Sequence, residues 1–167
     1  MAKEEYKMIE IVNANELDNE LDLDNETVDQ ICSLLVPAFQ ASNIGDSCNS
    51  FEFQHLWRSL QQNNGLPAIL FLLRDGNKIF GLLGGVTFDD PLTGLRYAAE
   101  VVWRVSPEAG GQGWGLKLLQ RFEWWAGSQG CKRIVLHGST KEEVALCQKI
   151  GPLGYNPYQI EYVKEIK

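Results

Sequence analysis

The sequence has few of the residues that metal sites and disulfide frameworks require. Four cysteines and two histidines are spread over 167 residues, and no pair of cysteines has the CxxC spacing that zinc sites use. We therefore expect no metal site. We also expect reduced and mostly buried thiols, as in a cytosolic protein.

Positive charge and long apolar runs are also scarce. Fifteen Lys and Arg against 22 Asp and Glu give a net charge of −7. This disfavours a nucleic-acid partner, because such binders usually carry a basic face. Apolar runs such as 68–73 are the length of a strand and far short of a membrane span, and the first residues lack the apolar segment of a signal peptide. We expect a cytoplasmic protein with no membrane partner. The acidic excess suits a cationic acceptor such as an amine, although solubility alone explains it.

The residue patterns predict a single domain spanning residues 1–167, of the α+β class. Helical spacing of apolar residues occurs at 28–39, 53–60 and 118–126, and a capping box at Thr140 opens a further helix. Strand-like runs occur at 6–12, 68–73, 79–88, 95–105, 132–137 and 158–166. The helix between 105 and 132 requires a crossover and hence a parallel strand pair, so the sheet should be mixed.

A glycine-rich turn joins the strand at 100–105 to the next helix. Its glycines are Gly110, Gly111, Gly113 and Gly115. Bare backbone can approach a ligand there, and the first N–H groups of a helix favour an anion, so a phosphate-bearing ligand is indicated. A turn without a ligand is the plain alternative. The P-loop does not fit, because Leu116 and Lys117 follow where Lys and Ser or Thr are needed, and the GxGxxG spacing of dinucleotide sites is also absent.

The segment from Val105 to Leu119, VSPEAGGQGWGLKLL, resembles the acyl-CoA-binding motif of the GNAT superfamily of N-acetyltransferases. The element order resembles that of small bacterial and phage members over essentially the whole chain. The resemblance implies a three-layer α-β-α fold. Its central sheet would be mixed, mostly antiparallel, and splayed between the strands at 100–105 and 132–137.

The resemblance also implies a ligand and a reaction. Acetyl-CoA would be the acyl donor, without a metal, and a primary amine would attack its thioester directly in a ternary complex. The acceptor could be a small molecule, a protein lysine or a protein N-terminus, and the protein a monomer or a homodimer. The residues implied in CoA binding are Trp103, Arg104 and Val105 along the pantetheine arm, Gly110, Gly111, Gln112, Gly113, Trp114 and Gly115 at the pyrophosphate, and Thr140.

Two positions depart from the family pattern. Gly110 stands where the family usually has Arg or Gln, which removes a side chain that Lys117 or Arg121 could replace. Cys147 stands where the family often has a tyrosine that acts as general acid. Cys147 is therefore an acid candidate, with a small buried thiol as the alternative, and Tyr155, Tyr158 or Tyr162 could take its place.

Glu100 is the candidate general base, since relatives carry a catalytic Glu near this position of the strand; an exposed Glu at a strand end is the alternative. His137 ends the strand at 132–137, where a structural histidine is the plainer interpretation. Two other functions stay open. One is a catalytically silent CoA-binding regulatory module. The other is a different small enzyme with a phosphate-bearing ligand, which the failed motifs disfavour.

Overall fold

The computed structural model describes residues 9–16, 23–42, 50–62, 65–109, 111–137 and 149–156. The chain separates into two compact units, residues 1–137 and 138–167, and each is described by itself. That the whole chain forms one domain stays a prediction. The described part of the second unit contains a short 3₁₀ turn, η4 (Gly151–Leu153). The predicted helix from Thr140 and the strand at 158–166 lie mostly or wholly outside the described residues.

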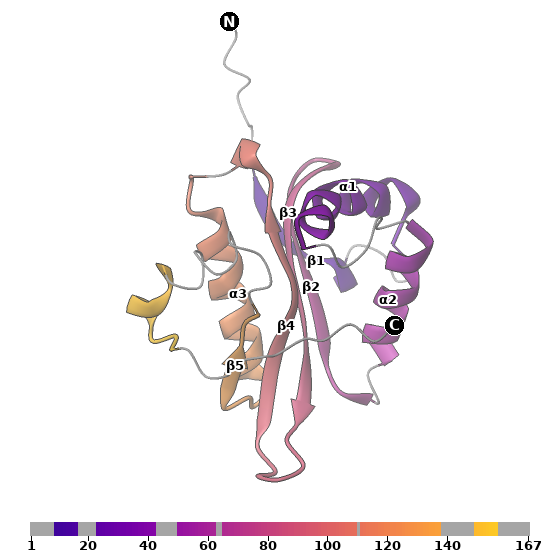
Figure 1. Cartoon of the computed structure of the whole chain (residues 1–167). Coiled ribbons are helices and arrows are strands. Elements are labelled where there is room, and N and C mark those ends of the chain that lie inside the picture. The colour runs from indigo at the N-terminus through magenta and orange to yellow at the C-terminus, as the bar shows by residue number, and fades with distance from the viewer. Residues whose placement is uncertain are drawn as a thin grey trace, which may run out of the picture. The chain divides into compact units, whose positions relative to one another are not determined.

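The first unit is built on a five-stranded sheet with the strand order β1-β2-β3-β4-β5 (Figure 1). The strands are β1 (Glu10–Asn13), β2 (Ala68–Asp75), β3 (Lys78–Asp89), β4 (Arg96–Val105) and β5 (Arg133–Val135). Neighbours pair antiparallel from β1 to β4, and only β4 and β5 are parallel. This confirms the mixed, mostly antiparallel sheet predicted from the sequence.

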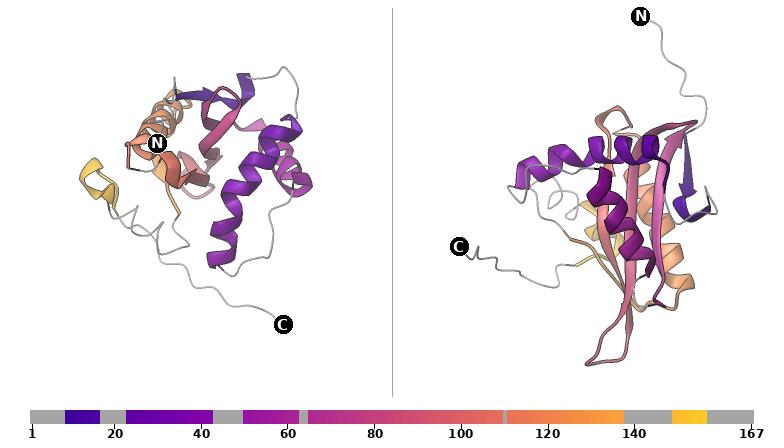
Figure 2. Two further views of the ribbon diagram at one scale, coloured as in Figure 1. Left: turned by 90° about the horizontal axis from the view of Figure 1, so that it is seen from above. Right: turned by 90° about the vertical axis from the view of Figure 1, so that its right-hand side faces the viewer.

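Three described helices cover the two faces of this sheet. Figures 1 and 2 show α1 (Asn25–Ser42) and α2 (Ser50–Gln62) on one face and α3 (Trp114–Ser128) on the other. Two 3₁₀ turns, η1 (Ala14–Glu16) and η3 (Pro107–Ala109), follow β1 and β4. The first unit therefore has the three-layer α-β-α arrangement that was expected.

Helix α1 begins where its capping residue predicts. The backbone N–H of Thr27 donates to the Asp24 carboxylate at 2.9 Å, and the Thr27 hydroxyl donates to the other carboxylate oxygen at 2.7 Å. These hydrogen bonds, the backbone one first, lower the pKa of Asp24 below its ordinary value of 3.8. The cap satisfies a helix N–H that has no partner within the helix.

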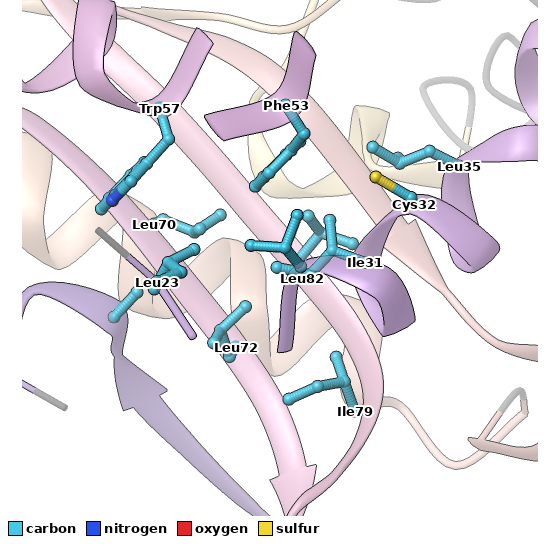
Figure 3. Packing of buried hydrophobic residues seen from close by; sticks show 12 residues of the cluster. Leu23, Ile31, Cys32, Leu35, Phe53, Trp57, Leu70, Leu72, Ile79 and Leu82 are labelled. Carbon is cyan, nitrogen blue, oxygen red and sulfur yellow. The ribbon is translucent and has the colours of Figure 1, made fainter. Parts of the chain in front are cut away.

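The core lies mainly between the sheet and the helices α1 and α2. Ile31 of α1, Phe53 and Trp57 of α2, and Leu70 and Leu72 of β2 are all buried in one cluster (Figure 3). Burial of each such side chain stabilises the fold by about 1.5–3 kcal/mol. On the other face α3 buries a stripe of residues at the expected helical spacing: Leu118, Leu119, Phe122, Trp125 and Ala126.

The sheet contains a bulge where β3 crosses β4. Gly84 pairs with Val102 and Gly85 pairs with Glu100, so Val101 is an extra residue in β4. Only glycine fits opposite this bulge. A Cβ at Gly85 would lie 2.5 Å from the carbonyl oxygen of Ala99 and 2.6 Å from the Phe122 ring. Glycine in β3 therefore accommodates both the bulge of β4 and the close approach of α3.

Candidate active site

Strands β4 and β5 separate halfway along β4. Their parallel pairing covers Tyr97, Ala98 and Ala99 of β4 and ends at Val135 of β5, whereas β4 continues to Val105. The sheet is therefore splayed at the place the sequence predicted. The regular part of β5, three residues, is shorter than the predicted strand at 132–137.

The bulge decides which backbone groups face the splay. Before it, the carbonyl oxygens of Arg96 and Glu100 face the β5 side, where they meet the Lys132 N–H at 2.8 Å and the His137 Nδ1 at 3.0 Å. After it, the Ser106 N–H donates to the Phe80 carbonyl of β3 at 2.7 Å. Successive residues of a strand face opposite edges. In a regular strand the backbone groups of all even-numbered residues would face the same edge. Because Val101 is an extra residue, the even-numbered residues face β5 before the bulge and β3 after it.

As a consequence, the backbone N–H and C=O groups of Trp103 and Val105 face away from β3. They lie on the edge of β4 that β5 leaves unpaired within the described residues. The Trp103 carbonyl also accepts a hydrogen bond from the Arg104 guanidinium at 3.2 Å, which sequence patterns did not reveal. An extended ligand with amide groups could pair with this edge as another strand would.

The glycine-rich turn follows directly and opens α3. Gly111 and Gly113 have φ angles of +77° and +75°, which residues with a side chain rarely adopt. Gly113 caps the helix without a side-chain hydrogen bond, and its carbonyl oxygen accepts a hydrogen bond from the Lys117 N–H at 3.1 Å. The N–H groups of Trp114, Gly115 and Leu116 precede that bond and have no acceptor inside the helix. Such N–H groups and the positive end of the helix dipole favour an anion at a helix start.

Trp103 connects this helix start to β4. Its side chain is only 8% exposed, and a Cβ on Gly115 would lie 3.9 Å from the Trp103 indole and 3.8 Å from a Val105 methyl group. The first turn of α3 thus packs against the end of β4 at Gly115. The indole Nε1 is buried without a partner among the described residues. Of the other tryptophans near this helix, Trp125 is buried, Trp114 is half-buried and Trp124 is 71% exposed.

Two cations flank the start of α3. Lys117 and Arg121 line an open hollow of about 310 Å³ together with Trp114, Gln120 and residues 9–11. The Lys117 Nζ lies 3.8 Å from the centre of the Trp114 ring, a cation–π distance. Positive charge is therefore present close to the turn in which Gly110 lacks a cationic side chain.

Glu100 and His137 meet where β4 and β5 part. Glu100 is 8% exposed, and its Oε2 accepts a hydrogen bond from the His137 backbone N–H at 3.1 Å. The exposed strand-end interpretation of Glu100 is thus wrong. Sequence reasoning considered both residues separately but did not reveal their contact, because it depends on the register of two strands 37 residues apart.

Several predicted site residues lie outside this description. Gly110, Thr140 and Cys147 are not among the described residues. Tyr155 is described and half-buried but belongs to the second unit. The roles assigned to all four stay predictions.

The described residues include two of the four cysteines. Cys32 and Cys131 are free thiols, and burial raises the pKa of Cys131. Among the described residues, no group of three or more His, Cys, Asp or Glu side chains could hold a metal ion. No helix in the described ranges has the length and apolar character needed to cross a membrane.

Known structures share this architecture. A GNAT family acetyltransferase from Staphylococcus aureus is 21% identical and has a TM-score of 0.66, with 95% of this chain and 98% of that chain covered. The ribosomal-protein-alanine N-acetyltransferase of Brucella melitensis is 17% identical, with a TM-score of 0.65 over 96% of this chain and 100% of its own. An aminoglycoside acetyltransferase from an uncultured soil metagenomic sample, in complex with sisomicin, is 19% identical, with a TM-score of 0.67 and 96% of each chain covered.

At sequence identities this low, the structural similarity shows that the fold is shared. A search of curated proteins by sequence found no match. The model of the acetyltransferase (GNAT) family matches residues 28–151, which include the unpaired edge of β4, the glycine-rich turn and α3. The chain belongs to the GNAT family of acetyltransferases.

Proposed function

We propose that this protein transfers the acetyl group of acetyl-CoA to a primary amine. The main support for the proposal is that two sets of free backbone groups follow one another along the chain. The unpaired edge of β4 ends at Val105, and the N–H groups at the start of α3 begin nine residues later. CoA has amide groups in its pantetheine arm and a pyrophosphate next to them. A ligand of that kind suits a strand edge followed by an anion site.

In this proposal the pyrophosphate binds at residues 111–115 and the arm runs back along Trp103 and Val105. The thioester then lies toward Glu100, at the closed end of the splay. The Trp103 backbone N–H, which faces the same edge, would donate to the oxyanion that forms when the amine attacks the carbonyl carbon. Lys117 and Arg121 supply the positive charge that Gly110 lacks. Cys147 and Tyr155 stay the candidates for protonating the leaving thiolate.

The acceptor class rests on the amine chemistry of the family and on the charge of the chain. Two of the three structures named above are a ribosomal-protein-alanine N-acetyltransferase and an aminoglycoside acetyltransferase in complex with sisomicin. Alanine and sisomicin both carry amino groups. A net charge of −7 attracts cationic acceptors over a range of about 10 Å at moderate salt. We therefore propose a small-molecule or protein amine as the acceptor, with no nucleic-acid or membrane partner, in the cytoplasm.

Two measurements test the proposal. Calorimetric titration with acetyl-CoA should give saturable heat, and the absence of heat at high ligand would refute the site. Thiol release should then be followed with L-lysine, spermidine, sisomicin and a peptide beginning with alanine. We expect release with at least one of the four. Heat without release from any of them would support the alternative, a catalytically silent CoA-binding module.

A further inference from the structure

The contact between His137 and Glu100 determines which nitrogen of the imidazole carries the hydrogen. His137 Nδ1 lies 3.0 Å from the Glu100 carbonyl oxygen. A carbonyl oxygen can only accept, so Nδ1 must be the donor. In the neutral ring the lone pair is then on Nε2. His137 is an exposed residue, so a molecule outside the protein can approach its imidazole.

Glu100 holds His137 at two points. Its carbonyl accepts from the ring, and its carboxylate Oε2 accepts from the His137 backbone N–H at 3.1 Å. The carboxylate is buried and turned toward that backbone group. The carboxylate thus holds the backbone of His137 and the carbonyl holds its ring, so the two contacts together set the direction of the imidazole.

The pair lies at the closed end of the splay. Glu100 directly follows the last residue of β4 that pairs with β5, and His137 lies two residues beyond the last paired residue of β5. Five residues separate Glu100 from Val105, which corresponds to about 16 Å of strand. A thioester whose pyrophosphate sits beyond Val105 therefore has its acyl end directed toward His137.

We propose that His137 Nε2 accepts the proton of the amine during acetyl transfer and that Glu100 is a positioning residue. The inference rests on the proposed function and identifies the general base of that reaction. The amine nitrogen forms a bond to the thioester carbonyl carbon, and its proton passes to Nε2. The C–S bond then breaks, the electron pair leaves with the sulfur, and the thiolate takes up a proton from the general acid, which regains one from the imidazolium through water. The products are an amide and CoA thiol.

The test compares His137→Gln with His55→Gln, a change at the other histidine of the chain, which lies on α2. Each is assayed with acetyl-CoA and the best amine of the wild-type panel. A glutamine at 137 can still donate to the Glu100 carbonyl but offers no basic nitrogen. We expect kcat to fall about 100-fold or more in His137→Gln, with acetyl-CoA affinity and Tm unchanged, and to stay at the wild-type value in His55→Gln. In His137→Ala, added imidazole should restore part of the lost kcat, which a purely structural role would not allow.

Variants of Glu100 test whether Glu100 or His137 is the general base. Glu100→Gln keeps an oxygen that can accept from the His137 N–H, so its kcat should stay within about 10-fold of wild type, whereas Glu100→Ala should lose more. If Glu100→Gln is as inactive as His137→Gln, or if His137→Gln keeps full kcat, the assignment is wrong while the proposed function stands. If the wild-type protein binds no acetyl-CoA or releases no thiol, the proposed function fails first and the assignment fails with it.

Discussion

Replacing Gly85 with alanine adds one methyl group where β3, the bulge of β4 and helix α3 meet. The new carbon would lie 2.5 Å from the Ala99 carbonyl oxygen and 2.6 Å from the Phe122 ring. Both neighbours resist movement, because one is strand backbone and Phe122 is fully buried. The strain must therefore spread into β4 or α3.

Such overpacking costs about 1–3 kcal/mol of the free energy of unfolding. For a chain of 167 residues, a loss of about 2 kcal/mol lowers Tm by about 4–8 °C. Gly127→Ala is the matched control. It adds the same methyl group inside α3 with no atom within 4 Å, and alanine in a helix stabilises by about 0.5–1 kcal/mol relative to glycine.

Equilibrium unfolding in urea and thermal melts, monitored by circular dichroism, measure both variants. We expect Gly85→Ala to be less stable than wild type and Gly127→Ala to be equal or more stable. Because the bulge sets the direction of the Trp103 and Val105 backbone groups, Gly85→Ala should also bind acetyl-CoA more weakly at a temperature at which it is fully folded. Wild-type stability in Gly85→Ala would refute the close packing described at the bulge.

The remaining predictions concern the cap of α1 and the start of α3. Asp24→Ala should cost about 1 kcal/mol. Since folding lowers the pKa of Asp24, its charge should stabilise the fold above pH ~4, and this contribution should be lost as the pH falls through the lowered pKa. The free energies of unfolding of wild type and Asp24→Asn should therefore differ less at low pH, and a difference that does not change with pH would contradict this. Lys117→Met should weaken acetyl-CoA binding more at low than at high salt, and an affinity loss independent of salt would argue against a charge contact.

Much of this architecture could be predicted from the sequence. The strand-like runs and the helical spacing of apolar residues predict the first four strands and the described helices, because these signals act over a few residues. The glycine-rich turn between β4 and α3 was equally readable, since its φ angles require glycine. The mixed sheet followed from the length of the crossover alone.

The details of the candidate site depend on contacts between distant segments. The extra residue at Val101 reverses which edge of β4 faces the splay, and a one-residue shift of this kind leaves no mark on the periodicity of a short strand. The contact between Glu100 and His137 needs the parallel register of β4 and β5. Burial of the Trp103 side chain depends on how closely α3 approaches at Gly115. None of these could be read without the fold.

The most direct test of the central claim is a calorimetric titration of acetyl-CoA into wild-type protein and into Gly113→Glu, side by side. Gly113 caps α3 with φ +75°, so a glutamate there is strained in the backbone and brings negative charge to the proposed pyrophosphate site. We predict saturable heat for the wild type and none for Gly113→Glu, with circular dichroism showing that both are folded. Equal affinity in the two proteins, or no heat in the wild type, would contradict the account.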